Sequence, residues 1–270
     1  MTNPAPLDLV TPPDGAPRAS VRLPRITVLT MFVRTLAIQG SWNYEILMGN
    51  GIGFCVEPAL RHLPGGQGGE AYRRALARQS HYFNAHPYMA SVAVGALARA
   101  ELDGEPEHRI ERFRTALCGP LGSVGDRLVW AGWLPLCSVA ALAAYGLGLG
   151  TLATLVVFLG AYNLGHVGLR VWGLRQGLRH GLRVASALGA PFLRQGPQHI
   201  SRAAALLAGV ALPLALYRII GTGRTLTMEV MGVVVALAVI LARLHGRVEG
   251  WRVALPLLAA FALYSVARHG

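Results

Sequence analysis

The chain has 270 residues, of which 53% are hydrophobic and only 14% are charged, and its mean hydropathy is +0.43. Soluble domains usually carry about 25% charged residues, so this composition indicates one membrane domain rather than two soluble domains. The formal net charge of +12 rests on arginine alone, because the chain contains no lysine. A Schiff-base lysine and a P-loop lysine are therefore excluded.

The first part of the chain predicts a tail followed by amphipathic helices. Residues 1–20 contain five prolines and lack a continuous apolar run. This composition predicts a disordered cytoplasmic tail rather than a signal peptide. Residues 21–268 then form a single membrane domain. Pro24–Gln39 predicts an amphipathic helix with proline in its first turn, and the segment Gly40–Asn43 ends that helix. A glycine-interrupted helix is expected to resume within Glu45–Leu63.

The next segments predict a surface helix and a solvated connection. A loop is expected at Gly65–Gly69. Glu70–His86 then predicts a basic amphipathic helix of the kind that lies on a membrane surface, ending before Pro87. Pro87–Ala100 is apolar but too short to cross a bilayer. Glu101–Glu111 predicts an acidic, solvated segment.

The longest uncharged stretch predicts a transmembrane hairpin. Leu128–Leu169 carries no Asp, Glu, Lys or Arg and is about twice as long as the roughly 20 helical residues that cross a bilayer. Gly146–Gly150 marks the break between two crossings. A buried hairpin in a large soluble protein is the alternative, but three further apolar runs favour the membrane: Ala203–Tyr217, Thr225–Ala242 and Val253–Ala267. The predicted fold class is an all-α integral membrane protein, in which N-terminal amphipathic or re-entrant helices precede about five transmembrane helices.

Arginine placement predicts the orientation of these spans. Residues 170–202 contain six arginines and no acidic residue, and four of the arginines recur at about one helical turn, forming a basic stripe: Arg170, Arg175, Arg179 and Arg183. If this segment is cytoplasmic, the arginines of two other loops fall on the same side, as the positive-inside rule requires. The N-terminus is then cytoplasmic. Because membrane topology explains the positive charge, no nucleic-acid partner is expected.

One polar cluster stands out in an apolar context. The segment Gln39–Glu45 combines amides, a hydroxyl, a carboxylate and two amphipathic rings. Sugars are bound by such groups, since a ring face stacks on the sugar while amides and carboxylates bind its hydroxyls. The alternative is a helix-breaking loop at the membrane interface. The candidate binding residues are Gln39, Ser41, Trp42, Asn43 and Glu45.

A second cluster, Gly119–Asp126, has glycine at every third residue and a lone carboxylate near a span. It predicts either a re-entrant turn whose amides face a polar ligand or a tight helix contact at small residues. A carboxylate near the membrane is a functional candidate, which adds Asp126 to the binding set. His81 and His86 are five residues apart and share no helix face, and the three cysteines have no metal spacing, so neither a metal nor a cofactor is expected.

Taken in order, these clusters resemble the IID subunit of the mannose/fructose/sorbose family of the phosphoenolpyruvate-dependent sugar phosphotransferase system. Gln39–Glu45 is similar to the QGSWN(F/Y)E signature of that family. Four more segments follow in collinear order: Gly53–Cys55 with Pro58 and Ala59, His81–Asn84 with Pro87, Gly119–Leu121 with Gly125 and Asp126, and Tyr162–Asn163 through Arg170, Gly173 and Gly177.

The resemblance implies a function that spacing alone does not give. A IID subunit pairs with a IIC subunit in the bacterial inner membrane, and together they bind a hexose and translocate it for phosphorylation by phospho-IIB, which is charged through IIA. The IID subunit is a non-phosphorylated part of this phosphohistidine–sugar phosphotransferase complex, with no phosphoryl-carrying residue of its own. The implied structural motif residues are Gly40, Asn84, Pro87, Gly119, Pro120 and Gly125.

Two departures from the family pattern keep a second function open. Arg127 stands where the family usually has proline after its glycine–aspartate pair, and only Gly221–Thr225 joins two late apolar runs where a longer polar insertion is usual. The alternative is therefore a degenerate, non-transporting membrane regulator or scaffold derived from this family.

Overall fold

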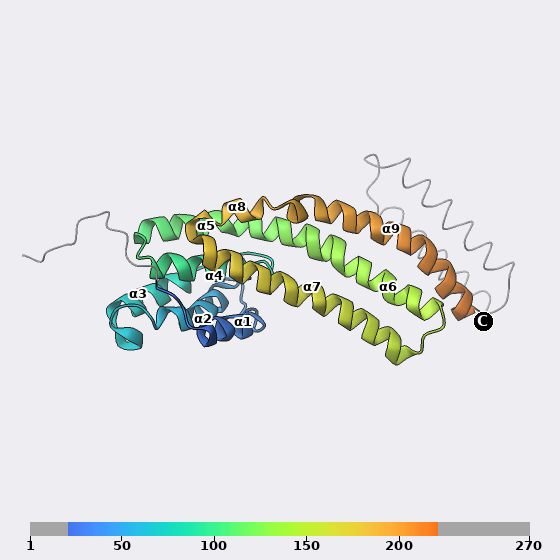
Figure 1. The fold of residues 1–270 in the computed structure, drawn as a ribbon, viewed down its shortest axis with the longest axis horizontal. Helices are drawn as coiled ribbons and strands as arrows, with labels where there is room; N and C mark the ends of the chain where they lie inside the picture. Colours follow the sequence, from blue (N-terminus) through green and yellow to red (C-terminus); the bar gives the residue numbers. More distant parts are fainter. Residues whose placement is uncertain (1–20, 221–270) are drawn as a thin grey trace, which may run out of the picture. The chain divides into compact units, whose positions relative to one another are not determined.

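The computed structural model describes residues 21–220, and the regular elements of this part are all helical (Figure 1). These residues divide into two compact units. The first holds the described residues up to 138 together with residues 155–206, and the second holds residues 139–154 and the described residues from 207 onward. The predicted tail, residues 1–20, lies outside the described residues.

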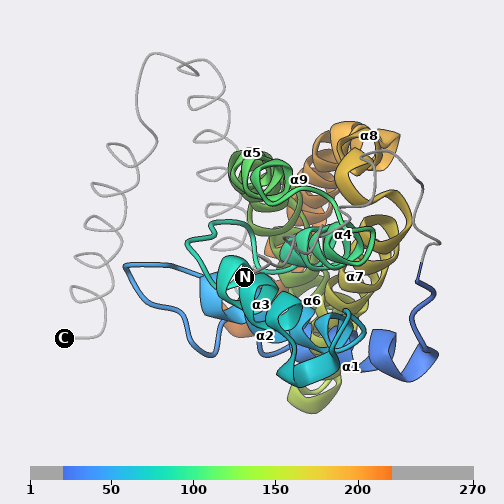
Figure 2. The same ribbon diagram turned by 90° about the vertical axis from the view of Figure 1, so that its left-hand side faces the viewer.

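Four short helices of the first unit precede the long ones (Figure 2); α1 and α2 pack against α4, and α3 packs against α2. They are α1 (Arg25–Thr35), α2 (Gly49–Leu60), α3 (Glu70–Gln79) and α4 (Ala90–Leu102). Pro24 directly precedes α1, where its missing N–H costs no helical hydrogen bond. Every residue of α4 except Arg99 is buried, so this apolar helix forms the centre of the unit rather than a membrane span.

Helix α3 differs from the prediction in its length and its surroundings. It ends at Gln79 rather than His86, because the carbonyl groups that follow accept hydrogen bonds from Arg114 instead of continuing the helix. Arg78 lies within the predicted basic surface helix, but it is buried and pairs with Glu101 and Glu107. The prediction of a wholly solvated acidic segment is therefore wrong at Glu101, whose carboxylate also accepts a hydrogen bond from Gln79.

Three helices are long and apolar enough to cross a membrane: Glu107–Gly146, Thr151–Arg183 and Ala185–Ile219. The first joins α5 (Glu107–Gly125), a π-helical segment η2 (Asp126–Trp133) and α6 (Leu134–Gly146). The second joins α7 (Thr151–His180) to the 3₁₀ turn η3 (Gly181–Arg183), and the third joins α8 (Ala185–Leu188) to α9 (Pro191–Ile220).

The predicted hairpin is confirmed, with its turn at residues 147–150 between α6 and α7. Gly148 adopts φ +106° in this turn, a conformation that side-chain-bearing residues rarely tolerate. The two later apolar runs, Thr225–Ala242 and Val253–Ala267, lie outside the described residues, so the count of about five spans is not established.

In the second unit, Arg218 of α9 holds the hairpin turn. Its Nη1 donates to the carbonyl oxygens of Tyr145 and Leu149, and its guanidinium lies 4.2 Å from the centre of the Tyr145 ring. Gly146 packs directly against Leu214, where a side chain would collide with the backbone of α9. The carbonyl groups at the end of α6 therefore receive donors, as they must in an apolar environment.

In the first unit, small residues allow α4 and α7 to approach closely. A Cβ atom at Gly177 would meet the backbone of Val92 and Ala96, and one at Gly173 would meet Ser91. Gly95 faces α7 in the same way. Glycines that bring two helix backbones together are typical of membrane helix contacts, and here they fix α7 against the buried α4.

Candidate functional site

The Gln39–Glu45 segment forms a chain of turns between α1 and α2, and Asn43 determines its shape. The Asn43 amide oxygen accepts hydrogen bonds from the backbone N–H groups of Glu45 and Ile46, both at 3.0 Å. The Asn43 and Leu47 backbones also bridge one another, and Leu47 adopts φ +50°. The Asn43 side chain therefore accepts hydrogen bonds from the backbone N–H groups of a turn in its own loop, as asparagine side chains commonly do.

The remaining side chains of this loop point outward. Trp42 is 45% exposed and Tyr44 is 89% exposed, and their rings meet edge to face at 4.9 Å. Gln39, Ser41 and Glu45 are also exposed. The loop thus presents two aromatic rings beside an amide, a hydroxyl and a carboxylate. Tyr44 was not among the predicted binding residues, although it is the second ring of the predicted cluster and comes two residues after Trp42.

The loop is attached to the segment that follows α3. The N–H of Met48 donates to the carbonyl of Phe83 at 3.0 Å, and the N–H of Phe83 donates to the carbonyl of Ile46 at 3.1 Å. The Phe83 ring is fully buried. A Cβ atom at Gly49 would overlap the carbonyl of His81, so glycine is needed for this approach. Two predicted motifs, far apart in the sequence, therefore share one short backbone ladder.

Arg114 of α5 secures the same segment, and sequence analysis did not single it out. Its guanidinium donates to the carbonyls of Gln79 at 2.9 Å, His81 at 2.8 Å and Tyr82 at 3.0 Å, and to the Gln79 side chain at 3.2 Å. It also lies 5.3 Å from the centre of the Phe83 ring. Arg114 is buried, so its N–H groups take the place of water as hydrogen-bond donors to the carbonyl groups at and just after the end of α3.

The Gly119–Asp126 cluster is helical, and the re-entrant turn is not what the structure shows. Pro120 lies inside α5, and η2 begins at Asp126. The tight-contact alternative holds at Gly125, where a Cβ atom would overlap the His86 side chain. At Gly119, by contrast, a Cβ atom would meet open space. Asp126 is exposed at this junction.

The segment between Phe83 and α4 connects the two clusters. Its Asn84 is exposed, Pro87 is buried, and His86 packs on Gly125. Within the described residues, no hydrogen bond or backbone bridge joins Asp126 directly to the Gln39–Glu45 loop. The structure thus links these predicted residues through one intermediate segment rather than gathering them in a single pocket.

His86 is buried and remains neutral. Its Nδ1 accepts the N–H of Tyr88 at 3.2 Å, so the proton resides on Nε2, which has no hydrogen-bond partner in the described part of the chain. Burial, helped by the positive charge of Arg170, lowers the pKa of His86 to about 4. The rings of Tyr88 and Trp130 lie 5.0 and 5.1 Å from it.

The fifth motif places Arg170 inside the protein. Arg170 is buried, donates from Nε to His166 Nε2 at 2.8 Å, and donates from Nη1 to the carbonyl of Thr35 at the end of α1. Because a guanidinium only donates, His166 carries its proton on Nδ1, which faces the Asn163 oxygen at 3.3 Å. The predicted four-residue basic stripe is therefore wrong at Arg170, since only the three later arginines are exposed.

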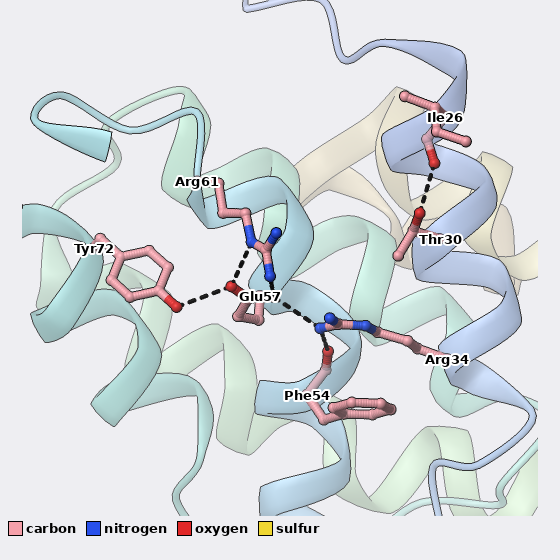
Figure 3. A network of polar contacts seen from close by, with 7 residues as sticks. All are labelled: Ile26, Thr30, Arg34, Phe54, Glu57, Arg61 and Tyr72. Atoms are coloured by element: carbon pink, nitrogen blue, oxygen red, sulfur yellow. Dashed lines mark hydrogen bonds and ion pairs between the residues drawn. The ribbon is translucent and has the colours of Figure 1, made fainter. Parts of the chain in front are cut away.

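A further polar network joins α1, α2 and α3 and is centred on Glu57 of α2 (Figure 3). The Glu57 carboxylate accepts from Arg34 of α1 at 2.8 Å, from Arg61 at 2.7 and 3.1 Å, and from Tyr72 of α3 at 2.9 Å. Burial alone would raise the pKa of Glu57, but these donors outweigh it and hold the pKa below its usual value. The network joins three helices through one carboxylate.

The geometry thus brings five separated motifs into one unit, and comparison with known proteins gives the reason. The family model described as the PTS system mannose/fructose/sorbose family IID component matches residues 22–208. The chain belongs to this family. All five motifs of this IID component fall within the matched residues, and the sugar phosphotransferase family assignment made from the sequence is confirmed.

Curated relatives carry the same designation. The mannose-specific EIID component of Escherichia coli K12 is 29% identical over 182 residues, which are 64% of this chain and 62% of that protein. The sorbose-specific EIID component of Klebsiella pneumoniae is 30% identical over 224 residues, covering 76% of this chain and 79% of the relative. The fructose permease IID component of Bacillus subtilis is 29% identical over 176 residues. The match thus spans somewhat less than two thirds of the E. coli relative.

Two solved structures share the fold. One, of the mannose transporter ManYZ in complex with microcin E492, aligns with a TM-score of 0.51 at 24% identity and covers 91% of this chain and 97% of its own. Another, described as the structure of a membrane protein, aligns with a TM-score of 0.67 at 23% identity and covers 91% and 98%. These likenesses and the three long apolar helices confirm an all-α membrane protein.

The described part of this IID component contains no cluster of three or more metal-ligating side chains. Its three cysteines, Cys55, Cys118 and Cys137, are not joined in disulfides. The loop between α1 and α2 offers exposed aromatic faces and hydrogen-bonding groups, and its backbone is held by Asn43 and by the hydrogen bonds to Phe83.

Proposed function

We propose that this IID component and a IIC subunit together form the membrane site that binds a hexose and presents it to phospho-IIB for phosphorylation. The site is in the bacterial inner membrane, with the N-terminus of this chain in the cytoplasm. The observation that carries the proposal is the loop between α1 and α2, whose backbone is fixed by Asn43 and Phe83 while Trp42 and Tyr44 remain exposed.

The chemistry of this loop suits a sugar. The C–H face of a hexose packs on an indole or phenol ring, and its hydroxyls both donate and accept hydrogen bonds. Trp42 supplies the ring, while Gln39, Ser41 and Glu45 supply the polar partners. Asp126 is a further partner in the proposal, and it is exposed at the start of η2. Asn43 contributes mainly by holding the loop, since its oxygen is already engaged.

An exposed apolar face supports a subunit that works with a partner in the membrane. Ile26, Leu29 and Val33 of α1 are each more than half exposed, and they recur at helical spacing. Such a face is covered by lipid or by another subunit, and a IIC subunit is the partner that we propose. IIA and IIB supply the phosphoryl group, so no residue of this chain carries it.

The regulator alternative receives little support from Arg127. Its side chain is exposed and donates to the carbonyl of Ser123 at 3.2 Å, within its own helix. The substitution therefore adds a charge at the surface without displacing a neighbour. The other departure, at Gly221–Thr225, lies outside the described residues.

Substitutions in the loop test the proposal. Trp42→Ala, Asn43→Ala and Glu45→Gln are expected to reduce phosphoenolpyruvate-dependent hexose uptake at least tenfold in vesicles that contain the partner subunits. Glu70→Gln, an exposed carboxylate on α3, is the matched control and should leave uptake unchanged. Unchanged uptake in all three loop variants, with normal membrane insertion, would exclude the loop as the sugar site.

A further inference from the structure

An apolar cavity of about 350 Å³ opens among the long helices of the first unit. Its walls come from η2, α7 and α9 and include Leu128, Val129, Trp172, Phe192 and Ile200. A sugar has no place here, because its hydroxyls would lose their water without gaining partners. Of the polar groups in the wall, His166 has both nitrogens engaged and the Tyr88 hydroxyl pairs with Tyr162, so Trp133 Nε1 is the side-chain donor left without a partner among the described residues. A single free donor cannot satisfy the hydroxyls of a sugar, and the occupant must therefore be largely apolar.

A second hollow of about 460 Å³ adjoins the cavity, and the two share Gly168 and Trp172 as lining residues. Its walls differ in character, since they include Arg175 and Arg179 together with Leu164 and Val171. The two arginines are four residues apart and thus lie on one face of the helix. Both are exposed.

Along α7 and its neighbours, the lining changes in one direction from apolar to basic. Gly165 and Gly168 border the cavity, Trp172 stands at the shared wall, and Arg175 and Arg179 follow. From Gly165 to Arg179 the helix rises about 20 Å, which is comparable with one leaflet and its headgroups, because the hydrocarbon core of a bilayer is about 30 Å thick. The order of apolar, aromatic and basic residues is that of a membrane interface.

We propose that these two hollows bind one anionic phospholipid, with an acyl chain in the apolar cavity and the phosphate at Arg175 and Arg179. The planar guanidinium groups match phosphate oxygens, and an anionic headgroup balances two adjacent positive charges. A free phosphate would use only the arginines and would leave the cavity unfilled. The lipid uses both hollows, and the site does not depend on whether this chain transports sugar.

The glycines of α7 provide a clean test of the cavity. A Cβ atom at Gly168 meets open space, and Gly168 lines both hollows, so Gly168→Leu adds its side chain at the wall that they share. A Cβ atom at Gly160, on the same helix, also meets open space, but Gly160 does not line the cavity, so Gly160→Leu is the matched control. For the headgroup, the double variant Arg175→Gln/Arg179→Gln is compared with Arg183→Gln, which changes an exposed arginine outside both hollows.

The full chain is titrated with phosphatidylglycerol and with phosphatidylcholine, and bound lipid is counted by native mass spectrometry. The wild type should retain one phosphatidylglycerol, and phosphatidylcholine should bind at least tenfold more weakly. Gly168→Leu should lose both lipids. The double arginine variant should lose its preference for phosphatidylglycerol, by about fivefold for each arginine removed. Both control variants should bind as the wild type does.

Two results would overturn the proposal. Equal retention of phosphatidylglycerol by Gly168→Leu and Gly160→Leu would show that no acyl chain enters the cavity, and that the arginines only attract phosphate at the surface. Equal affinity of the wild type for the two lipids would remove the headgroup site. Melting curves of every variant, measured in the same detergent, distinguish a lost site from a lost fold.

Discussion

Replacing Glu57 by glutamine should destabilise the first unit by about 3 kcal/mol, because this one carboxylate joins three helices. The side chain keeps its size and one acceptor oxygen but loses its charge. Hydrogen bonds to charged groups contribute about 1.5–3 kcal/mol each when they are buried. Two of the donors are largely shielded from water, since Tyr72 is buried and the Arg34 side chain is 21% exposed, and roughly half of their combined contribution should be lost. Arg61 is about half exposed and contributes less through solvent screening.

The measurement is the apparent melting temperature of the purified chain in detergent, recorded at a fixed heating rate because membrane proteins often unfold irreversibly. A loss of about 3 kcal/mol corresponds to a decrease of roughly 6–12 °C for a chain of this size. Glu70→Gln is the control, since Glu70 also pairs with two arginines but is exposed, and its melting temperature should not change. Equal melting temperatures for Glu57→Gln and Glu70→Gln would refute the argument that the buried carboxylate holds the helices together.

Three further predictions concern His86, the contact between α4 and α7, and Arg114. Wild-type stability should fall as the pH decreases from about 6.5 toward 4, because His86 is protonated in the unfolded chain in this window, whereas its pKa in the folded protein is about 4. The melting temperature of His86→Gln should therefore depend less on pH than that of the wild type. The same pH dependence in both proteins would contradict a buried, neutral His86. Gly177→Ala should cost about 2 kcal/mol by forcing α4 and α7 apart, whereas Gly160→Ala should be neutral or stabilising, as differential scanning fluorimetry can measure. Arg114→Lys should lower the free energy of unfolding by about 2–4 kcal/mol and impair uptake, because the ammonium group of lysine cannot reach the four acceptors that the planar guanidinium contacts. A variant that melts and takes up hexose as the wild type does would argue against this role.

Local patterns in the sequence predicted most of the helices. Apolar periodicity and glycine placement gave α1, the resumed helix within Glu45–Leu63 and the hairpin with its turn at Gly146–Gly150. These features depend on neighbours within a few residues. The order of five motifs also gave the family, which the family model and the curated relatives confirm.

Contacts between distant residues could not be read in the same way. Charge patterning placed Arg78 in a basic surface helix, Glu101 in a solvated segment and Arg170 in a basic stripe. In the structure, Arg78 and Glu101 are buried and pair with each other, and Arg170 is buried and donates to the carbonyl of Thr35 at the end of α1. The early end of α3 follows from Arg114, 35 residues beyond Gln79. The contact of the Asn43 amide oxygen is local and common for asparagine in turns, but this side chain was predicted only as a sugar ligand.

Reconstitution with and without this chain tests the central claim most directly. Vesicles containing a IIC subunit, the soluble phosphocarriers and phosphoenolpyruvate are supplied with labelled mannose, fructose, sorbose or glucosamine, and internal sugar phosphate is measured. We expect sugar phosphate to accumulate for at least one hexose only when this chain is present. Accumulation that is the same without the chain, or none for any hexose with both subunits inserted and folded, would contradict its role in sugar translocation.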